Sequence, residues 1–228
     1  MESSLALPDY VDDLGNGLIR RWSTVADEGK IGACLAAVFR DKADDPPNQT
    51  MVNRLAVLFS PGHPLMGPGD FAVVEDTSHA ERPIVACTCL WRQCWSYAGI
   101  PFGLGRPEYV AALPEYRNRG LVRALFEMLH ARSAARGDLV QAITGIPYYY
   151  RKFGYEYALD LYGIRRVYLA DIPQAEAQPA EAQPAEAQPA EAKPQAYRLR
   201  PAAAGDTADL LDLYNQRRAH SLVWCETD

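Results

Sequence analysis

The stretch Pro114–Leu125 reads PEYRNRGLVRAL and places Arg117, Arg119 and Arg123 around a glycine where a helix is expected to begin. The first turn of a helix has unpaired N–H groups and partial positive charge, so it normally prefers acidic neighbours. A tight turn ending at Gly120 can direct several N–H groups at one point, where an anion is stabilised. Forked arginine donors suit phosphate oxygens. The stretch therefore predicts a site for a small anion, with pyrophosphate the expected group.

A second interpretation of the same residues is a solvated basic helix end that pairs with nearby acidic side chains. Glu115 precedes the turn, and Glu127 follows Arg123 at the i, i+4 spacing of helix-face ion pairs. Composition alone does not decide between the two interpretations. No phosphate-binding Gly-x4-Gly-Lys-Ser/Thr loop occurs, and GLGRPE at Gly103 lacks the third glycine of a dinucleotide fingerprint.

The segments around this stretch predict a β-α-β crossover. A strand at Pro107–Leu113 leads into a helix at about Gly120–Arg136, which Gly137 ends as a C-cap, and a strand at Asp138–Thr144 follows. Apolar side chains recur along one face of the expected helix. They are Leu121, Val122, Leu125, Phe126, Met128 and Leu129. This helix is therefore expected to pack on a sheet.

Further strands and helices alternate along the first 173 residues. The strands are expected at Gly17–Ala26, Asp70–Thr77, Pro83–Trp95, Tyr155–Leu161 and Ile164–Ala170, with the second and third forming an antiparallel hairpin. Helices are expected at Asp27–Asp41 and Met51–Phe59, and a short helix or turn at Pro147–Gly154. The mixed pattern predicts an α/β (α+β) domain with the crossover at its centre.

A repeat divides the chain. Residues Gln174–Gln195 repeat Ala-Glu-Ala-Gln-Pro, and a proline at every fifth position prevents a continuous helix. The segment is expected to be a linker between residues 1–173 and 196–228. The second piece predicts a strand at Tyr197–Arg200 and a helix from Asp206, too little for a stable domain. It either docks on the first domain or opens a further domain whose remainder lies outside the chain, and the sequence favours the latter.

The composition limits the classes of partner. The 228 residues carry a net charge of −6, which argues against a nucleic-acid-binding protein. No basic and apolar leader is present, and no run approaches the roughly 18 apolar residues of a membrane span. The five cysteines and four histidines match no metal-binding spacing. The sequence predicts a cytoplasmic protein without metal, and with neither nucleic acid nor a membrane as partner.

Two ordered motifs resemble the GNAT acetyltransferase superfamily over roughly residues 15–170. RNRGLV at Arg117–Val122 resembles the family's Arg/Gln-x-x-Gly-x-Gly/Ala loop, which holds the pyrophosphate of acetyl-CoA through backbone N–H groups. YVAAL, ending at Leu113, resembles the splayed strand that pairs with the pantetheine arm, and YYYRKFGY at Tyr148–Tyr155 resembles a late family motif. The resemblance implies a GNAT fold with a mixed, mostly antiparallel sheet, and acetyl-CoA as cosubstrate. It implies these cofactor-binding residues: Val110, Ala111, Ala112, Arg117, Asn118, Arg119, Gly120, Leu121, Val122 and Arg123.

A closer resemblance is to the Eis (enhanced intracellular survival) branch, through RNRGLVRAL and YYRKFGYE. It implies that Tyr150 is the catalytic acid and that residues 196–228 begin a second GNAT-like domain of a longer protein. Val122 departs from the superfamily's Gly or Ala, although the branch accepts a larger residue there. The branch also uses its C-terminal carboxylate as a base, and Asp228 is not the equivalent of that group. The general base is therefore not identified, and Glu108 is a weak candidate.

The resemblance implies an N-acetyltransferase that moves acetyl directly from acetyl-CoA to a primary amine. The alternative is a non-catalytic CoA-binding or assembly module of a tandem GNAT protein. Trp22, Trp91 and Trp95 could line an acceptor pocket, although packing is their commoner use. The sequence does not identify the acceptor amine, and a homo-oligomer of the full-length protein is compatible with it.

Overall fold

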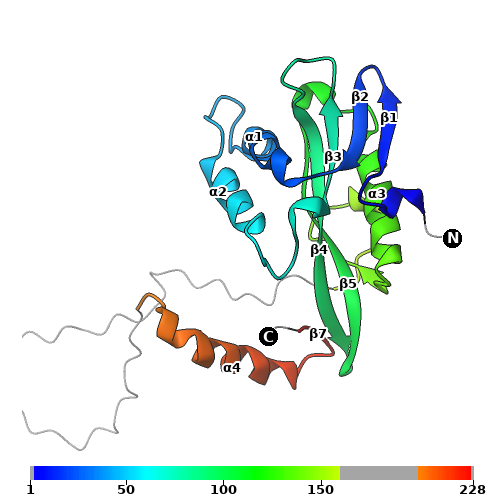
Figure 1. Ribbon diagram of the computed structural model, residues 1–228. Helices are drawn as coiled ribbons and strands as arrows, with labels where there is room; N and C mark the ends of the chain where they lie inside the picture. The colour runs from blue at the N-terminus through cyan, green and yellow to red at the C-terminus, as the bar shows by residue number, and fades with distance from the viewer. Residues whose placement is uncertain (1–2, 160–199, 227–228) are drawn as a thin grey trace, which may run out of the picture. The chain divides into compact units, whose positions relative to one another are not determined.

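A mixed sheet organises the larger of two units in the computed structural model, which describes residues 3–159 and 200–226 (Figure 1). This unit comprises Met1–Glu156 and Ser221–Asp228, and the other comprises Tyr157–His220. The expected strand at Ile164–Ala170 and the repeat at Gln174–Gln195 lie outside the described residues.

The strands of the sheet follow the order β1-β2-β3-β4-β5-β6, and β7 pairs with β4 beside this path. Their bounds are β1 (Val11–Gly15), β2 (Leu18–Trp22), β3 (Phe71–Asp76), β4 (Ile84–Tyr97), β5 (Ile100–Ala112), β6 (Val140–Gln141) and β7 (Val223–Cys225). The helices are α1 (Glu28–Val38), α2 (Gln49–Leu58), α3 (Leu121–Ala135) and, in the second unit, α4 (Thr207–Arg218). Among the strands of the described residues, β5 and β6 are the one pair that runs in parallel, and α3 connects them. The predicted α/β fold, its crossover and its mostly antiparallel sheet are confirmed.

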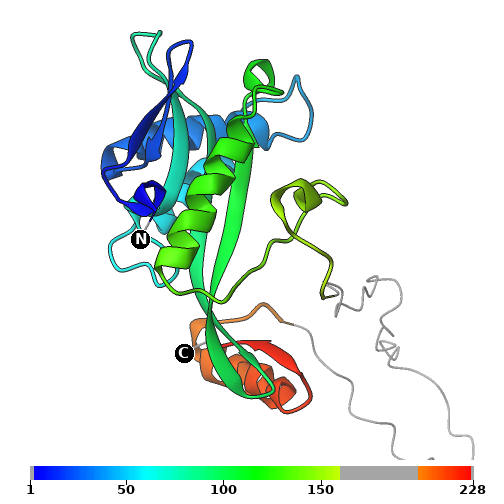
Figure 2. The same ribbon diagram turned by 90° about the vertical axis from the view of Figure 1, so that its right-hand side faces the viewer.

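Alternation along β3 assigns two cores to the two faces of the sheet. Phe71 and Val73 pack with α1 and α2, whereas Ala72 and Val74 pack with α3. Figure 2 shows α3 lying along its face of the sheet. The α3 residues buried there are Leu121, Leu125, Met128 and Leu129. The apolar face predicted for this helix is therefore the one that packs on the sheet.

Several element boundaries differ from the predictions. The strand β1 was not predicted, and β5 begins at Ile100 rather than Pro107 because it pairs with β4 along its whole length. The strand expected at Asp138–Thr144 is reduced to β6, since the chain leaves β5 after Ala142. Residues 155–159 form no strand.

The strand β7 extends the distal half of the β4–β5 hairpin. Trp95 pairs with Cys225 and Tyr97 with Val223. The ladder continues with hydrogen bonds from Glu226 N to Cys94 O and from Ala98 N to Leu222 O, both 2.8 Å. The sequence did not predict this strand, whose three residues carry no turn signal of their own.

Candidate functional site

The predicted anion loop is the turn between β5 and α3. Its last residue, Gly120, is the N-cap of α3 and has a φ of +79°, a conformation that residues with a side chain rarely adopt. Asn118 also has a positive φ, +62°. No side chain caps the helix, and the space in front of Gly120 is open. The first N–H groups of α3 are therefore available to a ligand.

A bulge displaces β5 just before this loop. Cys89 pairs with Glu108 but Cys87 with Ala111, so two residues of β5 stand opposite one of β4. Tyr109 absorbs the distortion with a φ of +53°. On its other side, β5 pairs with β6 only at Leu104 and Gly105. Among the described residues, the edge of β5 from the bulge to Ala112 thus has no strand partner there, and its backbone groups can pair with an extended ligand.

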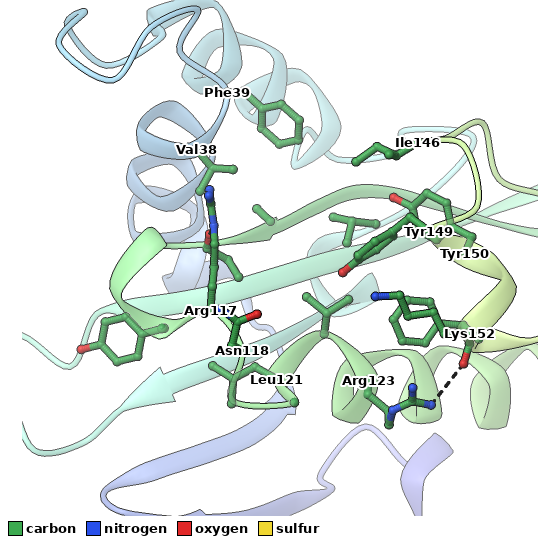
Figure 3. A pocket seen from close by; sticks show the side chains of 17 residues that line it. Val38, Phe39, Arg117, Asn118, Leu121, Arg123, Ile146, Tyr149, Tyr150 and Lys152 are labelled. Carbon is green, nitrogen blue, oxygen red and sulfur yellow. Dashed lines mark hydrogen bonds between the residues drawn. The ribbon is translucent and has the colours of Figure 1, made fainter.

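A cavity of about 590 Å³ joins the loop, this edge of β5 and the turn that carries Tyr150 (Figure 3). The predicted site residues that line it are Val110, Ala111, Ala112, Arg117, Asn118, Gly120, Leu121, Val122, Arg123 and Tyr150. Arg119 is the predicted residue that does not line it. Seven further residues line the cavity without having been predicted from the sequence: Val38, Phe39, Tyr116, Ile146, Tyr149, Lys152 and Phe153. Three of them, Tyr149, Lys152 and Phe153, lie within the motif at Tyr148–Tyr155, so the sequence could have indicated them. No local sequence feature indicates that Val38 or Phe39 lines a cavity.

The three arginines take different directions. Arg117 donates from Nε to Ala112 O (3.2 Å), and Arg123 donates from Nη1 to Lys152 O (3.2 Å), so both line the cavity (Figure 3). Arg119 instead donates to Glu115 O (2.9 Å). The alternative interpretation paired Arg123 with Glu127. In the structure Glu127 Oε2 instead accepts a hydrogen bond from Arg20 at 2.8 Å.

The charge of the cavity lining is entirely positive. Arg117, Arg123 and Lys152 contribute cations, and none of the 17 described lining residues carries a carboxylate. An open helix N-terminus, a glycine in the left-handed conformation and a cationic rim form a setting that suits the diphosphate of a nucleotide-bearing ligand. Within the described part of the chain, no three His, Cys, Asp or Glu side chains group in a way that could hold a metal ion.

Tyr150 lies in an aromatic cluster at the other side of the cavity. Its ring centroid lies 5.0 Å from that of Tyr149, 5.9 Å from Phe126 and 6.3 Å from Tyr155. Burial raises the pKa of Tyr150 to about 12, and Tyr149 and Glu108 contribute further increases. The phenol therefore keeps its proton at neutral pH and can act as a donor toward the cavity.

The remaining sequence candidates lie outside the cavity lining. Glu108 accepts a hydrogen bond from Arg106 Nε at 2.7 Å, yet it is close enough to influence the pKa of Tyr150. Trp22 is 2% exposed in the core, where the guanidinium carbon of Arg132 lies 3.4 Å from its ring centroid. Trp91 packs against the core of α1 and α2. The packing interpretation of these two tryptophans is thus the correct one.

Comparisons with known proteins identify the family and the fold. A model of the acetyltransferase (GNAT) domain family matches residues 21–158. A GNAT family acetyltransferase from Brucella melitensis, solved in complex with acetyl-CoA, is 19% identical, with a TM-score of 0.50 over 63% of this chain and 85% of that chain. A search of curated proteins found no match.

Two longer proteins match only in part. A conserved protein of Enterococcus faecalis V583 is 15% identical with a TM-score of 0.47, over 61% of this chain and 32% of that chain. Eis1 from Mycobacterium abscessus is 14% identical with a TM-score of 0.45, over 60% of this chain and 31% of that chain. The chain thus spans about a third of the length of each.

None of the described helices has the length and apolar character needed to cross a membrane.

The family match covers more than half of the chain, including the loop, the bulged strand and the late aromatic motif. The chain belongs to the GNAT acetyltransferase family.

Proposed function

We propose that this chain is an acetyl-CoA-dependent N-acetyltransferase that moves an acetyl group directly to a primary amine. The observation that carries the proposal is the uncapped N-terminus of α3, which opens into the same cavity as the Tyr150 side chain. One end of that cavity can bind a diphosphate, and the other presents a proton donor. A bound thioester joins these two requirements in one ligand.

The loop residues hold the pyrophosphate in this proposal. The backbone N–H groups of Gly120, Leu121 and Val122 converge on it, and Arg117 and Arg123 balance its charge. The open edge of β5 at Val110–Ala112 pairs with the pantetheine arm, as an added strand would. This remote binding supplies the energy that orients the thioester beside Tyr150. Anchoring and chemistry are thus assigned to separate parts of one cavity.

The transfer requires two proton movements. The amine nitrogen attacks the thioester carbonyl carbon, a C–N bond forms, and the C–S bond breaks. Tyr150 gives its proton to the departing sulfur and is reprotonated from solvent, so the products are an amide and a free thiol. The amine also loses a proton, and the candidate base is Glu108, the carboxylate of β5. Its ion pair with Arg106 keeps that carboxylate oriented.

We also propose that the chain represents an Eis-like branch of the family. The support is the pair of motifs RNRGLVRAL and YYRKFGYE. In this proposal the N-acetyltransferase domain comprises residues 1–173, the repeat at 174–195 is a linker, and residues 196–228 begin a second GNAT-like domain. The pairing of β7 with β4 indicates that the end of the segment 196–228 contributes a strand to the sheet of the first unit.

Titration of acetyl-CoA into the protein tests the binding half of the proposal. The variant Gly120→Glu is expected to abolish binding, because it places a carboxylate where the pyrophosphate lies and adds a side chain at a left-handed φ. Gly120→Gln separates bulk from charge and is expected to retain more affinity. Gly137→Glu is the matched control, since Gly137 has a similar φ (+76°) at the opposite end of α3. Unchanged affinity in Gly120→Glu would discard the pyrophosphate assignment.

Turnover of Tyr150→Phe tests the catalytic half. With an amine that the wild type acetylates in a screen, kcat is expected to fall roughly 100-fold, the low end for general acid catalysis, while acetyl-CoA affinity holds. The wild type should keep its turnover to about pH 10, because an acid works while protonated and burial raises this pKa to about 12. Equal kcat in the variant removes Tyr150 from the role. Binding without turnover on a broad amine panel would favour the non-catalytic CoA-binding module.

A further inference from the structure

A hydrogen bond ties the anion loop to the far end of β3. The hydroxyl of Tyr116, in the short 3-10 helix η4 (Pro114–Tyr116), donates to Asp76 Oδ2 at 2.7 Å. Asp76 is the last residue of β3 and is 5% exposed. Tyr116 lines the cavity but Asp76 does not. The carboxylate therefore acts on the loop from behind, without access to a ligand.

Asp76 is itself held in one orientation. Its Oδ1 accepts hydrogen bonds from Ser78 N (2.9 Å) and Ser78 Oγ (2.6 Å), which leaves Oδ2 directed at Tyr116. Hydrogen bonds from Ser78, and then from Tyr116, lower the pKa of Asp76 to about 2. The acceptor is thus ionised at neutral pH, and hydrogen bonds to ionised groups are stronger than those between neutral ones.

The ring of Tyr116 is held on its face as well. The guanidinium carbon of Arg119 lies 4.9 Å from the ring centroid, and Arg119 Nη2 is fixed by Glu115 O. This accounts for the absence of Arg119 from the cavity lining: its charge is used on the aromatic ring. Tyr116 is thus fixed at its hydroxyl and its face, four residues before the glycine at which the helix N–H groups converge.

We propose that Asp76 and Tyr116 are positioning residues that set the conformation of the anion loop for pyrophosphate binding. The inference rests on the proposed function, in which the loop holds that group. Convergent N–H groups bind an anion well only when they point at one place, and a small displacement of the turn spoils this geometry. The sheet supplies the fixed reference, because β3 is buried along its whole length.

The variants Tyr116→Phe and Asp76→Asn test the proposal with two ligands. Acetyl-CoA carries the pyrophosphate, whereas S-acetylpantetheine has the same thioester and arm without it. Loss of the charged hydrogen bond is expected to raise the Kd for acetyl-CoA roughly tenfold. The Kd for S-acetylpantetheine, measured by displacement, should change less than about twofold, because the edge of β5 remains intact. The double variant should bind no more weakly than the weaker single variant, since Tyr116→Phe removes the bond and Asp76→Asn removes the charge on its acceptor.

Tyr10→Phe is the matched control. Arg20 lies 5.7 Å from the Tyr10 ring centroid and Asp12 interacts with its hydroxyl, but Tyr10 does not line the cavity. The variant Tyr10→Phe should leave the Kd values for acetyl-CoA and for S-acetylpantetheine unchanged. An unchanged Kd for acetyl-CoA in folded Tyr116→Phe overturns the proposal, as does an equal loss for both ligands. Failure of the proposed function looks different, because the wild type would then bind acetyl-CoA no better than S-acetylpantetheine.

Discussion

The ring of Tyr150 occupies the space that a side chain at Gly145 would need. A Cβ at position 145 would clash with Cε2 and Cδ2 of the Tyr150 ring, and Gly145 has no positive φ that would itself forbid a side chain. The glycine is thus needed for the approach of the ring rather than for the turn. The absence of a side chain at Gly145 therefore fixes the place of the Tyr150 ring, the proton donor of our proposal.

Gly145→Ala is therefore expected to displace the Tyr150 ring. We predict a loss of about 1 kcal/mol in the free energy of unfolding, typical of overpacking at a partly exposed site, and a lower kcat at unchanged acetyl-CoA affinity. Urea unfolding and initial rates measure the two effects. Gly29→Ala is the control, because Gly29 lies in α1 with open space around it. If Gly145→Ala keeps full kcat, the ring tolerates the shift and the steric argument fails.

At this scale the sequence predicted the backbone better than the side chains. The helix start at Gly120 follows from local rules for glycine and helix termini, and the structure confirms it. The directions of the arginines do not follow from local rules. Glu127 pairs with Arg20 of β2, 107 residues earlier in the chain, and not with Arg123 at the i, i+4 position. The roles assigned to the cavity residues stay predictions.

At the scale of elements, a buried network of charged side chains joins β2 and β3 to the start of α1. Arg21 of β2 donates to Asp27, which precedes α1, at 2.7 and 2.8 Å, and to Glu75 of β3 at 2.8 Å. Both carboxylates are less than 5% exposed. Burial alone would raise their pKa values, but hydrogen bonds from Arg21, together with those from Thr24 to Asp27 and from Arg82 to Glu75, more than offset it and lower both. The network thus fixes α1, whose C-terminal end lines the cavity, to two strands.

Arg21→Met is expected to cost about 3–5 kcal/mol in the free energy of unfolding at pH 7, because buried Asp27 loses its cationic partner and Glu75 is left with Arg82 and Lys30 alone. In the wild type, carboxyls with lowered folded pKa values stabilise above their unfolded pKa, so stability falls with acidification from about pH 5. The variant should lose less stability on acidification, since Asp27 without a cationic partner gains from protonation while Glu75 stays paired with Arg82. Urea unfolding at pH 7 and pH 4 measures both. Arg20→Met is the control, since its partners Asp12 and Glu127 are 39% and 52% exposed and its loss should cost about 1 kcal/mol or less.

Sequence patterns predicted the elements that have a strong period and missed those that depend on a partner. α3 shows helical spacing, and β3 is an apolar run buried on both faces, so both were predicted. The first half of β5, with Gly103 and Pro101, resembles a loop, and only its pairing with β4 makes it a strand. The bulge at Tyr109 and the separation of β6 from β5 are equally invisible in the sequence. These two features create the ligand-accessible edge.

At the scale of the whole molecule, β7 joins the C-terminal part of the chain to the hairpin of the first unit. Replacing Trp224 and Glu226 by proline removes strand pairing, because Glu226 N donates to Cys94 O and the register places Trp224 opposite Ser96. We predict faster hydrogen exchange at the Ala98 amide, which donates to Leu222 O, and an unchanged Kd for acetyl-CoA, since no cavity residue belongs to β7. Exchange by mass spectrometry and titration measure the two. Weaker acetyl-CoA binding in this variant would contradict the independence of the cavity from β7.

The late position of β7 has a consequence for synthesis. Every residue that lines the cavity precedes Gly154, whereas β7 begins at Val223. At roughly 5–20 residues per second, the ribosome needs several seconds to add the intervening chain. Local hairpins and helices form in microseconds, far faster than this delay. The nascent protein can therefore complete its cavity before β7 is synthesised, and until then the edge of β4 that pairs with β7 has no partner.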